Sequence, residues 1–175
     1  MKKIILGLLL TVFLAGCSEG RTVVQEEWEV SPTFEIPITF GNGTKGTYVL
    51  IGEEGRLGFL IGSGNEGEVE AEPIIKGIEN KYMWHFWGKD EELNGNFKVI
   101  GINEEGEEHK VLLQNMGMPT SEKVWEYPNM GLSSNNGADT HIPSGMEFQT
   151  SGLWKLKVYF DENFFGEIVV NVVEG

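Results

Sequence analysis

The sequence is poor in cysteine and in basic residues. It has one Cys in 175 residues, and 13 Lys and Arg stand against 27 Asp and Glu, giving a formal net charge of -14. A single cysteine excludes a disulfide within the monomer and any metal site built from several thiolates. Because a phosphate backbone is bound through clusters of Lys and Arg, the acidic balance argues against a nucleic-acid partner.

The longest apolar run lies at the N-terminus, where Lys2 and Lys3 precede the uncharged residues 4–14. This run is much shorter than the roughly 20 residues that a membrane-spanning helix needs. A positive start followed by a short apolar stretch is typical of a secretory signal. We therefore expect residues 1–16 to be a signal peptide that is removed from the mature protein.

The end of this stretch, Leu14-Ala15-Gly16-Cys17, resembles the lipobox of bacterial lipoproteins. The resemblance implies signal cleavage between Gly16 and Cys17 and attachment of a diacylglyceryl group to the Cys17 thiol. The mature chain would then begin at Cys17 and be held by lipid on the extracytoplasmic face of the cell membrane. No thiol would remain for catalysis or redox chemistry.

Residues 17–33 show no sustained periodicity and include four glutamates. We expect the lipidated cysteine and an acidic tether here, with Trp28 docking on the domain that follows. Because anionic lipids repel negative charge, the tether should hold the domain off the membrane surface. Residues 34–175 are long enough for one domain with its own core and too few for two.

Short apolar runs rich in β-branched and aromatic residues recur through this domain, separated by turns containing Gly, Asn and Glu. After the signal peptide, no window keeps a helical period. The pattern predicts an all-β fold, an antiparallel β-sandwich of seven or eight strands. The predicted strands are residues 34–40, 47–51, 57–61, 83–87, 97–102, 110–113, 154–160 and 168–173.

Alternation is clearest in the predicted C-terminal hairpin. Lys155 and Lys157 are expected to point to solvent, and the apolar residues of the same strand to point inward. The inward set is Trp154, Leu156, Val158 and Phe160. An earlier strand carries Tyr82, Trp84 and Phe86 on one face, which could stack on a sugar or peptide. A central, covered strand explains them better, with Trp87 at the strand's end as the remaining candidate.

Several segments resemble an uncharacterised family of small Gram-positive lipoproteins. They are GRLGF (55–59), MWHFWG (83–88), PSGM (143–146), TSGLWKLKVY (150–159) and FGEIVV (165–170). The closing hairpin is similar to the last two strands of bacterial immunoglobulin-like domains, in which a Gly-x-Trp segment opens the penultimate strand. The resemblance implies an immunoglobulin-like β-sandwich in the cell envelope, and it carries over no catalytic residue.

Within the polar stretch 128–143, residues 129–141 are rich in turn-forming residues and are expected to contain no strand. Loops longer than about 12–15 residues in compact domains are usually functional or disordered. Its side chains suit adaptable hydrogen bonding, with apolar contact added by Met130 and Leu132. The candidate binding loop therefore consists of Asn129, Ser133, Asn135, Asn136, Asp139 and His141.

Catalytic and metal-binding patterns are incomplete in this sequence. His85, His109 and His141 lack ligand spacing, and residues 90–96 imitate half of a calcium loop but have Gly101 at the twelfth position. Weak calcium binding at residues 90–96 stays open. Ser144, His141 and Asp139 have no Gly-x-Ser-x-Gly elbow to expose a nucleophile. We expect no metal, no cofactor and no catalytic residue.

The leading interpretation is a non-enzymatic, membrane-anchored module that binds an envelope protein or a cell-wall component. One alternative is an enzyme, or an enzyme's accessory subunit, that uses acidic residues. Another is a purely structural envelope domain. An enzyme should bring carboxylates together in a pocket, whereas a binding module should present a shallow edge or a surface of loops.

Overall fold

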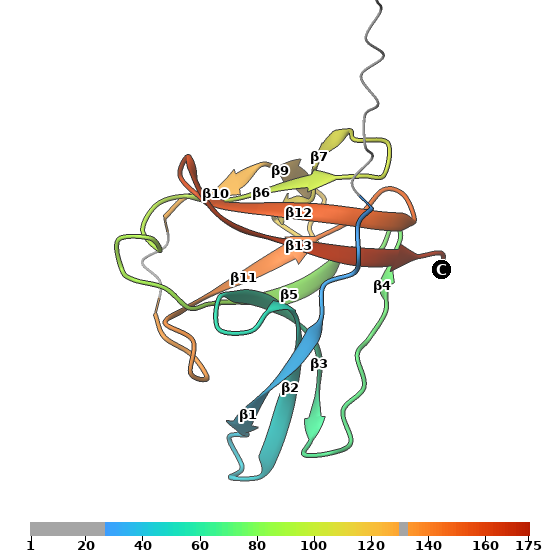
Figure 1. Ribbon diagram of the computed structural model, residues 1–175. Coiled ribbons are helices and arrows are strands. Elements are labelled where there is room, and N and C mark those ends of the chain that lie inside the picture. Colours follow the sequence, from blue (N-terminus) through green and yellow to red (C-terminus); the bar gives the residue numbers. More distant parts are fainter. Residues whose placement is uncertain (1–26, 130–132) are drawn as a thin grey trace, which may run out of the picture.

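The computed structural model describes residues 27–129 and 133–175, and the regular structure in these ranges is entirely β (Figure 1). The predictions for residues 1–16 and for Cys17, and the contacts expected of Met130 and Leu132, fall outside the described residues. Over the described ranges, no helix is long and apolar enough to cross a membrane.

In the described residues, 13 strands form two sheets that pack face to face (Figure 1). The first sheet has the order β1-β2-β3-β5-β11-β8-β9, and the second has the order β10-β6-β12-β13-β4, with β7 also paired to β6. Neighbouring strands are antiparallel, except for the short parallel pair β13–β4. The bounds are β1 Thr33–Thr39, β2 Lys45–Glu53, β3 Leu57–Asn65, β4 Ile74–Ile75, β5 Asn80–Phe86, β6 Phe97–Ile102, β7 Glu108–Lys110, β8 Leu112–Gln114, β9 Glu122–Val124, β10 Glu126–Tyr127, β11 Thr140–Met146, β12 Gly152–Phe160 and β13 Asn163–Val173.

The predicted all-β sandwich is confirmed, although it contains more strands than expected. All eight predicted segments overlap strands, although Phe40 and Trp87 lie just beyond the ends of β1 and β5. The segment 110–113 divides at Val111 between β7 of one sheet and β8 of the other. Three of the unpredicted strands, β4, β9 and β10, have only two or three residues, too few to show alternation.

The prediction of no strand in residues 129–141 is wrong at its C-terminal end. Strand β11 begins at Thr140 and lies between β5 and β8. Pro143 and Gly145 hide it in the sequence, because both residues are depleted in strands. Its seven paired positions along β5 show that tertiary context determines this strand.

The core lies between the sheets and confirms the predicted inward faces. Trp154, Leu156, Val158 and Phe160 of β12 are at most 1% exposed. From the other sheet, Trp84 and Phe86 are fully buried, and their rings contact Phe97 of β6 at 5.5 and 5.6 Å between centroids. Aromatic rings from both sheets therefore join in one cluster at edge-to-face distances.

Lys155 corrects the prediction that both lysines of β12 face solvent. Its side chain does lie on the outer face of the sheet, but it is only 6% exposed because the chain preceding β1 crosses over it. The Lys155 ammonium lies 3.4 Å from the Glu167 carboxylate and 4.9 Å from the centre of the Trp28 ring. The expected docking of Trp28 on the domain is confirmed.

We expect Lys155→Ala to destabilise the protein by about 1–2 kcal/mol, because it removes a cation–π contact, a buried aliphatic stem and the partner of Glu167. Lys157→Ala, on the same outer face but without these contacts, is the matched control and should change stability by less than about 0.5 kcal/mol. Urea unfolding of the two variants measures the difference. Equal effects would contradict the role given to Trp28.

Candidate functional site

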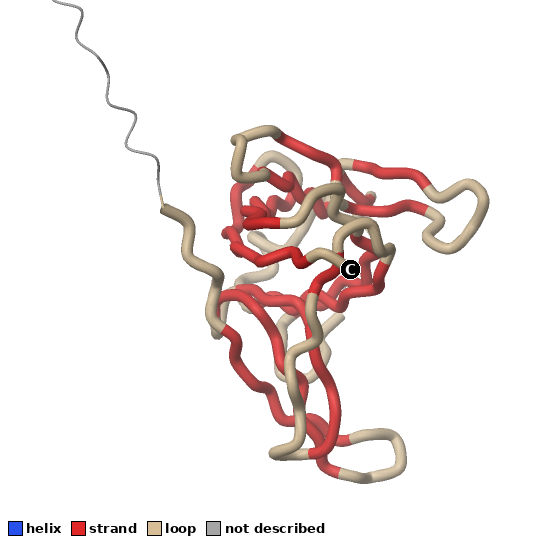
Figure 2. The backbone as a smooth tube through the Cα atoms, turned by 90° about the vertical axis from the view of Figure 1, so that its right-hand side faces the viewer, coloured by secondary structure: helices blue, strands red, loops and turns tan. Residues whose placement is uncertain are grey.

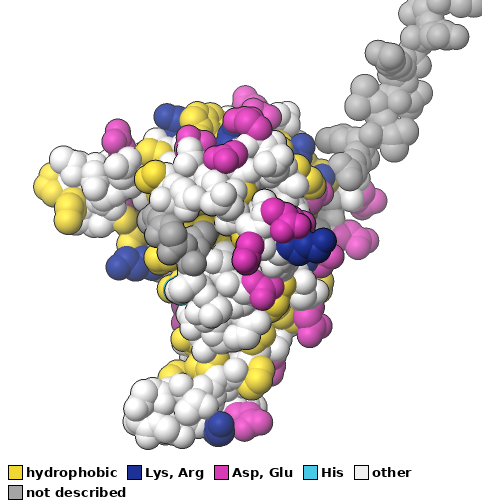
Figure 3. All heavy atoms as spheres, turned by 90° about the vertical axis from the view of Figure 1, so that its left-hand side faces the viewer, with side chains coloured by type: hydrophobic (Ala, Val, Ile, Leu, Met, Phe, Trp, Pro, Cys, Tyr) yellow, Lys and Arg dark blue, Asp and Glu magenta, His cyan; other side chains and the backbone are white. Residues whose placement is uncertain are grey.

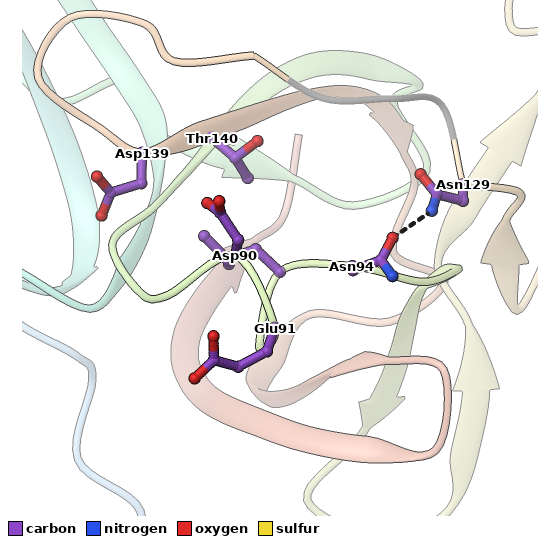
Figure 4. Close-up of a pocket in the computed structure, with 7 residues that line it drawn as sticks. Asp90, Glu91, Asn94, Asn129, Asp139 and Thr140 are labelled. Atoms are coloured by element: carbon purple, nitrogen blue, oxygen red, sulfur yellow. Dashed lines mark hydrogen bonds between the residues drawn. The ribbon is translucent and has the colours of Figure 1, made fainter.

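A polar groove opens at one end of the sandwich, where the β5–β6 loop faces the chain leading into β11 (Figure 4). Its volume is about 620 Å³. The residues that line it are Asp90, Glu91, Leu93, Asn94, Asn129, Asp139 and Thr140. Figure 4 shows the Asp90 carboxylate directed toward the side formed by Asp139 and Thr140, whereas Glu91 turns away from that side.

Hydrogen bonds between the two loops hold the groove in shape. The Asn129 side-chain amide donates to Asn94 Oδ1 at 2.8 Å, and the Asn129 backbone N–H donates to Asn96 Oδ1 at 3.1 Å. On the other side, the Gly88 N–H donates to the Asp139 carboxylate at 3.0 Å. Residues about 35–50 positions apart in sequence thus meet in one site.

The β5–β6 loop is also tied to the rigid part of the sandwich. Arg56 pairs with Glu92 at 3.1 Å and donates to the Phe165 carbonyl, while its guanidinium lies 3.6 Å over the Phe165 ring. The Lys89 N–H and the Arg56 guanidinium both stabilise the Glu92 carboxylate, so the pKa of Glu92 is lowered. These contacts place the loop on β13, which supports a preformed groove.

The structure brings some of the predicted loop residues into the groove and leaves others outside it. Asn129 and Asp139 line it. Asn135 and Ala138 form an isolated bridge around a turn in which Asn136 has a positive φ of 48°, and the Gly137 carbonyl accepts from Trp87 Nε1 at 2.8 Å. Asn135, Asn136 and Ser133 are not among the groove residues.

His141 does not lie in a polar loop as expected. It belongs to β11, opposite His85 of β5, and its Nδ1 lies 2.7 Å from the Ser133 carbonyl. The contact ties the predicted loop to the sheet. His141 therefore positions the loop and does not face the groove.

Sequence reasoning considered residues 90–96 and residues 129–141 as separate segments, and it did not single out Thr140 or Leu93. Only the fold shows that Asp90, Asn94, Asn129 and Asp139 line one surface. Each segment carries a detectable signal, since both are long, polar and rich in turn residues. No signal in the sequence pairs them.

Catalytic and metal arrangements can be checked against these positions. Ser144 faces the core, where its hydroxyl accepts from Trp84 Nε1 at 3.0 Å, whereas His141 lies on the opposite side of the same strand. Ser144, His141 and Asp139 therefore form no triad. Among the described residues, no three His, Cys, Asp or Glu side chains form a group that could hold a metal ion.

His85 is a buried histidine on the outer side of β5, stacked 6.3 Å from Trp87. Its Nδ1 lies 3.2 Å from the Met83 carbonyl, which can only accept, so Nδ1 carries the proton. Within the part of the chain that the structure describes, Nε2 has no hydrogen-bond partner. Burial lowers the pKa of His85, the Met83 carbonyl opposes this effect, and nearby His141 adds to the lowering.

This arrangement predicts that acid destabilises the domain through His85. The unfolded chain takes up a proton near pH 6.5 and the folded chain only at lower pH, so stability is lost as the pH falls below about 6.5. Thermal midpoints measured between neutral and mildly acidic pH should fall more steeply in the wild type than in His85→Phe. Identical slopes would show that His85 does not titrate differently in the folded protein.

Comparisons with known proteins show to which family the chain belongs. Residues 21–170 match the family described as Domain of unknown function (DUF4871), and the chain belongs to it. Residues 1–18 match the prokaryotic membrane lipoprotein lipid attachment site. The protein is therefore a membrane-associated lipoprotein with a lipid anchor, as the lipobox predicts.

A crystal structure of a candidate lipoprotein from Bacillus anthracis is similar over 84% of this chain and 87% of that one, with 22% identity and a TM-score of 0.56. At this identity the similarity shows a shared fold. An immunoglobulin-like protein from Pseudomonas aeruginosa aligns over 86% of this chain and 99% of that one, with 14% identity and a TM-score of 0.30, and supports no argument. None of the curated proteins compared with the chain matches it.

Proposed function

We propose that this lipoprotein is a non-enzymatic binding module on the extracytoplasmic face of the cell membrane. Its ligand would be an envelope protein or a cell-wall component, bound in the groove between the β5–β6 loop and the chain before β11. The observation that carries the proposal is the meeting of two polar loops in one open groove at the end of the sandwich. The two inner faces of the sheets are already committed to the core.

The groove chemistry indicates the class of ligand. Asp90, Glu91 and Asp139 supply carboxylates that accept hydrogen bonds, and Asn94 and Asn129 supply amides that both donate and accept. Such a set favours hydroxyl or ammonium groups over anions. Hydroxyl-rich glycans and lysine-bearing peptides both carry these groups.

Reversing one charge in the groove tests the proposal. Asp90→Arg should reduce capture of the retained envelope component by about tenfold or more, because a favourable polar contact becomes a repulsive one. The bait is the soluble chain from residue 18, incubated with envelope extract. The matched control is Glu66→Arg, with the same charge change, beyond the Asn65 end of β3. The opposite end of β3 is the one near the groove, because Leu57 there pairs with Phe86, the last residue of β5 before the β5–β6 loop. Glu66 therefore lies at the end of β3 that is away from the groove.

The control separates a specific site from general electrostatics. Capture that falls equally in both variants would show that only the net charge matters, and capture unchanged in both would place the site elsewhere. The rim around Trp87 is then the next candidate. Chemical alteration of the captured component would favour the enzyme alternative, because the groove contains three carboxylates.

A further inference from the structure

The outer face of the second sheet carries a smaller excess of acidic residues than the rest of this protein. We propose that this face lies against the lipid surface that anchors the chain, which replaces the expectation that the acidic tether holds the domain off the membrane. The face is formed by the outward side chains of β6, β7, β12 and β13. Its principal residues are Lys98, Ile100, Lys110, Lys157, Tyr159 and Phe164. The partner is the headgroup layer of an anionic membrane, and the inference rests on the lipid anchor and not on the groove.

The first observation is that the chain from the anchor arrives on this face. Going back from β1, the Pro32 carbonyl accepts from the Gly52 N–H, and Ser31 makes two hydrogen bonds with the backbone of Val169 in β13, both 2.9 Å long. Trp28 then lies over Lys155 of β12. Figure 1 shows the described chain passing in front of β13 and β12, and Figure 2 shows it running along one side of the molecule.

The second observation is that the segment between the lipid anchor at Cys17 and the docked Trp28 is short. Glu27 lies ten positions after Cys17, so even a fully extended tether spans at most about 35 Å. A domain of about 150 residues has a radius near 19 Å, and the path around it to the opposite face is about 60 Å. The outer face of the first sheet therefore cannot reach the membrane while Trp28 stays docked.

The third observation is charge. The outward lysines of this face are balanced by acids, and the crossing segment adds Glu27 and Glu29. The set is Lys98, Lys110, Lys155 and Lys157 with Glu27, Glu29, Glu108, Glu126, Glu162 and Glu167, which leaves -2 of the protein's formal -14. Further acidic side chains lie over the groove end, on the face of the molecule that Figure 3 shows. An anionic membrane surface should repel the groove end more strongly than the outer face of the second sheet, because that face carries only a small part of the negative charge.

The fourth observation is an amphipathic hollow on the same face. It has a volume of about 510 Å³ and is lined by Lys98, Ile100, Glu108, Lys110, Val124, Trp125 and Glu126. Trp125 is 36% exposed, with the Lys110 ammonium 6.0 Å from its ring centre, and Phe164 is 55% exposed. Exposed Trp beside Lys is the combination found at membrane interfaces. The tether holds these weak contacts at high local concentration.

A pair of labelled variants tests the orientation. Lys157→Cys and Lys81→Cys each remove one lysine from an outward position, on β12 of the second sheet and β5 of the first. In the full lipidated protein the anchor occupies Cys17, so a fluorescent donor reacts only with the new thiol. The protein is inserted in vesicles of equal parts phosphatidylglycerol and phosphatidylcholine that contain an acceptor-labelled lipid.

Energy transfer to the lipid should be about twofold or more higher from position 157 than from position 81, because two stacked sheets and their side chains separate the positions. Phe164→Cys supplies a second position on the same face and should behave like Lys157→Cys, which guards against a poorly folded variant. Equal transfer from both faces, or higher transfer from position 81, would overturn the proposal.

Discussion

Cys17→Ser is expected to abolish membrane attachment, the largest effect of any single substitution in this protein. The sequence contains no other cysteine, and the lipid attachment site lies in residues 1–18. Without a thiol there is no acceptor for the diacylglyceryl group, and the remaining apolar run is too short to span a bilayer. Fractionation should find the variant soluble or as an uncleaved precursor, and metabolic labelling with palmitate should find no incorporation.

Ser18→Ala is the matched control for this prediction, because it changes the neighbouring hydroxyl and keeps the thiol. It should leave attachment and palmitate labelling unchanged. Palmitate that persists in Cys17→Ser would mean that the lipid is attached at another residue, and the lipobox interpretation would be wrong.

Trp154→Ala is expected to destabilise the domain by about 3–5 kcal/mol, since it removes a large buried ring and leaves a cavity. Trp154 is 1% exposed, donates from Nε1 to the Thr150 carbonyl at 3.0 Å, and contacts the rings of Phe148 and His109 at 5.4 and 5.2 Å. Because whole domains are stable by only about 5–15 kcal/mol, the variant should be close to unfolding at room temperature. Urea denaturation measures the loss.

Trp125→Ala is the control for Trp154→Ala, because the same residue type is removed from an exposed position. Trp125 is 36% exposed on the outer face of the second sheet. Its removal should cost well under half as much as that of Trp154. A comparable cost would mean that burial does not govern the difference between the two tryptophans.

Strand alternation and residue type were sufficient to predict the body of this fold. The pattern of β12 gives the correct inward face, with Trp154 and Phe160 buried, because a half-buried strand must separate apolar from polar residues. The same reasoning gives β5 as a central strand, since Trp84 and His85 are buried on its two opposite sides. Such local patterns can be recognised in the sequence without knowledge of tertiary contacts.

Features that depend on contacts between residues far apart in the chain could not be predicted from the sequence. Alternation places Lys155 outward correctly but cannot show that Trp28, more than 120 residues earlier, covers it. Strand β11 has almost no local propensity and exists because β5 and β8 flank it. The groove needs Asn94 and Asn129 to meet, which follows from the packing of the loops and from no motif.

The central claim, a binding groove between two loops, is tested most directly by amide hydrogen exchange of the soluble chain, with and without the envelope component that it captures. Ligand bound in the groove should slow exchange in peptides covering residues 88–96 and 133–141, and leave the β3–β4 loop, residues 66–73, unchanged. Slowed exchange elsewhere, with residues 88–96 and 133–141 unaffected, would contradict the account.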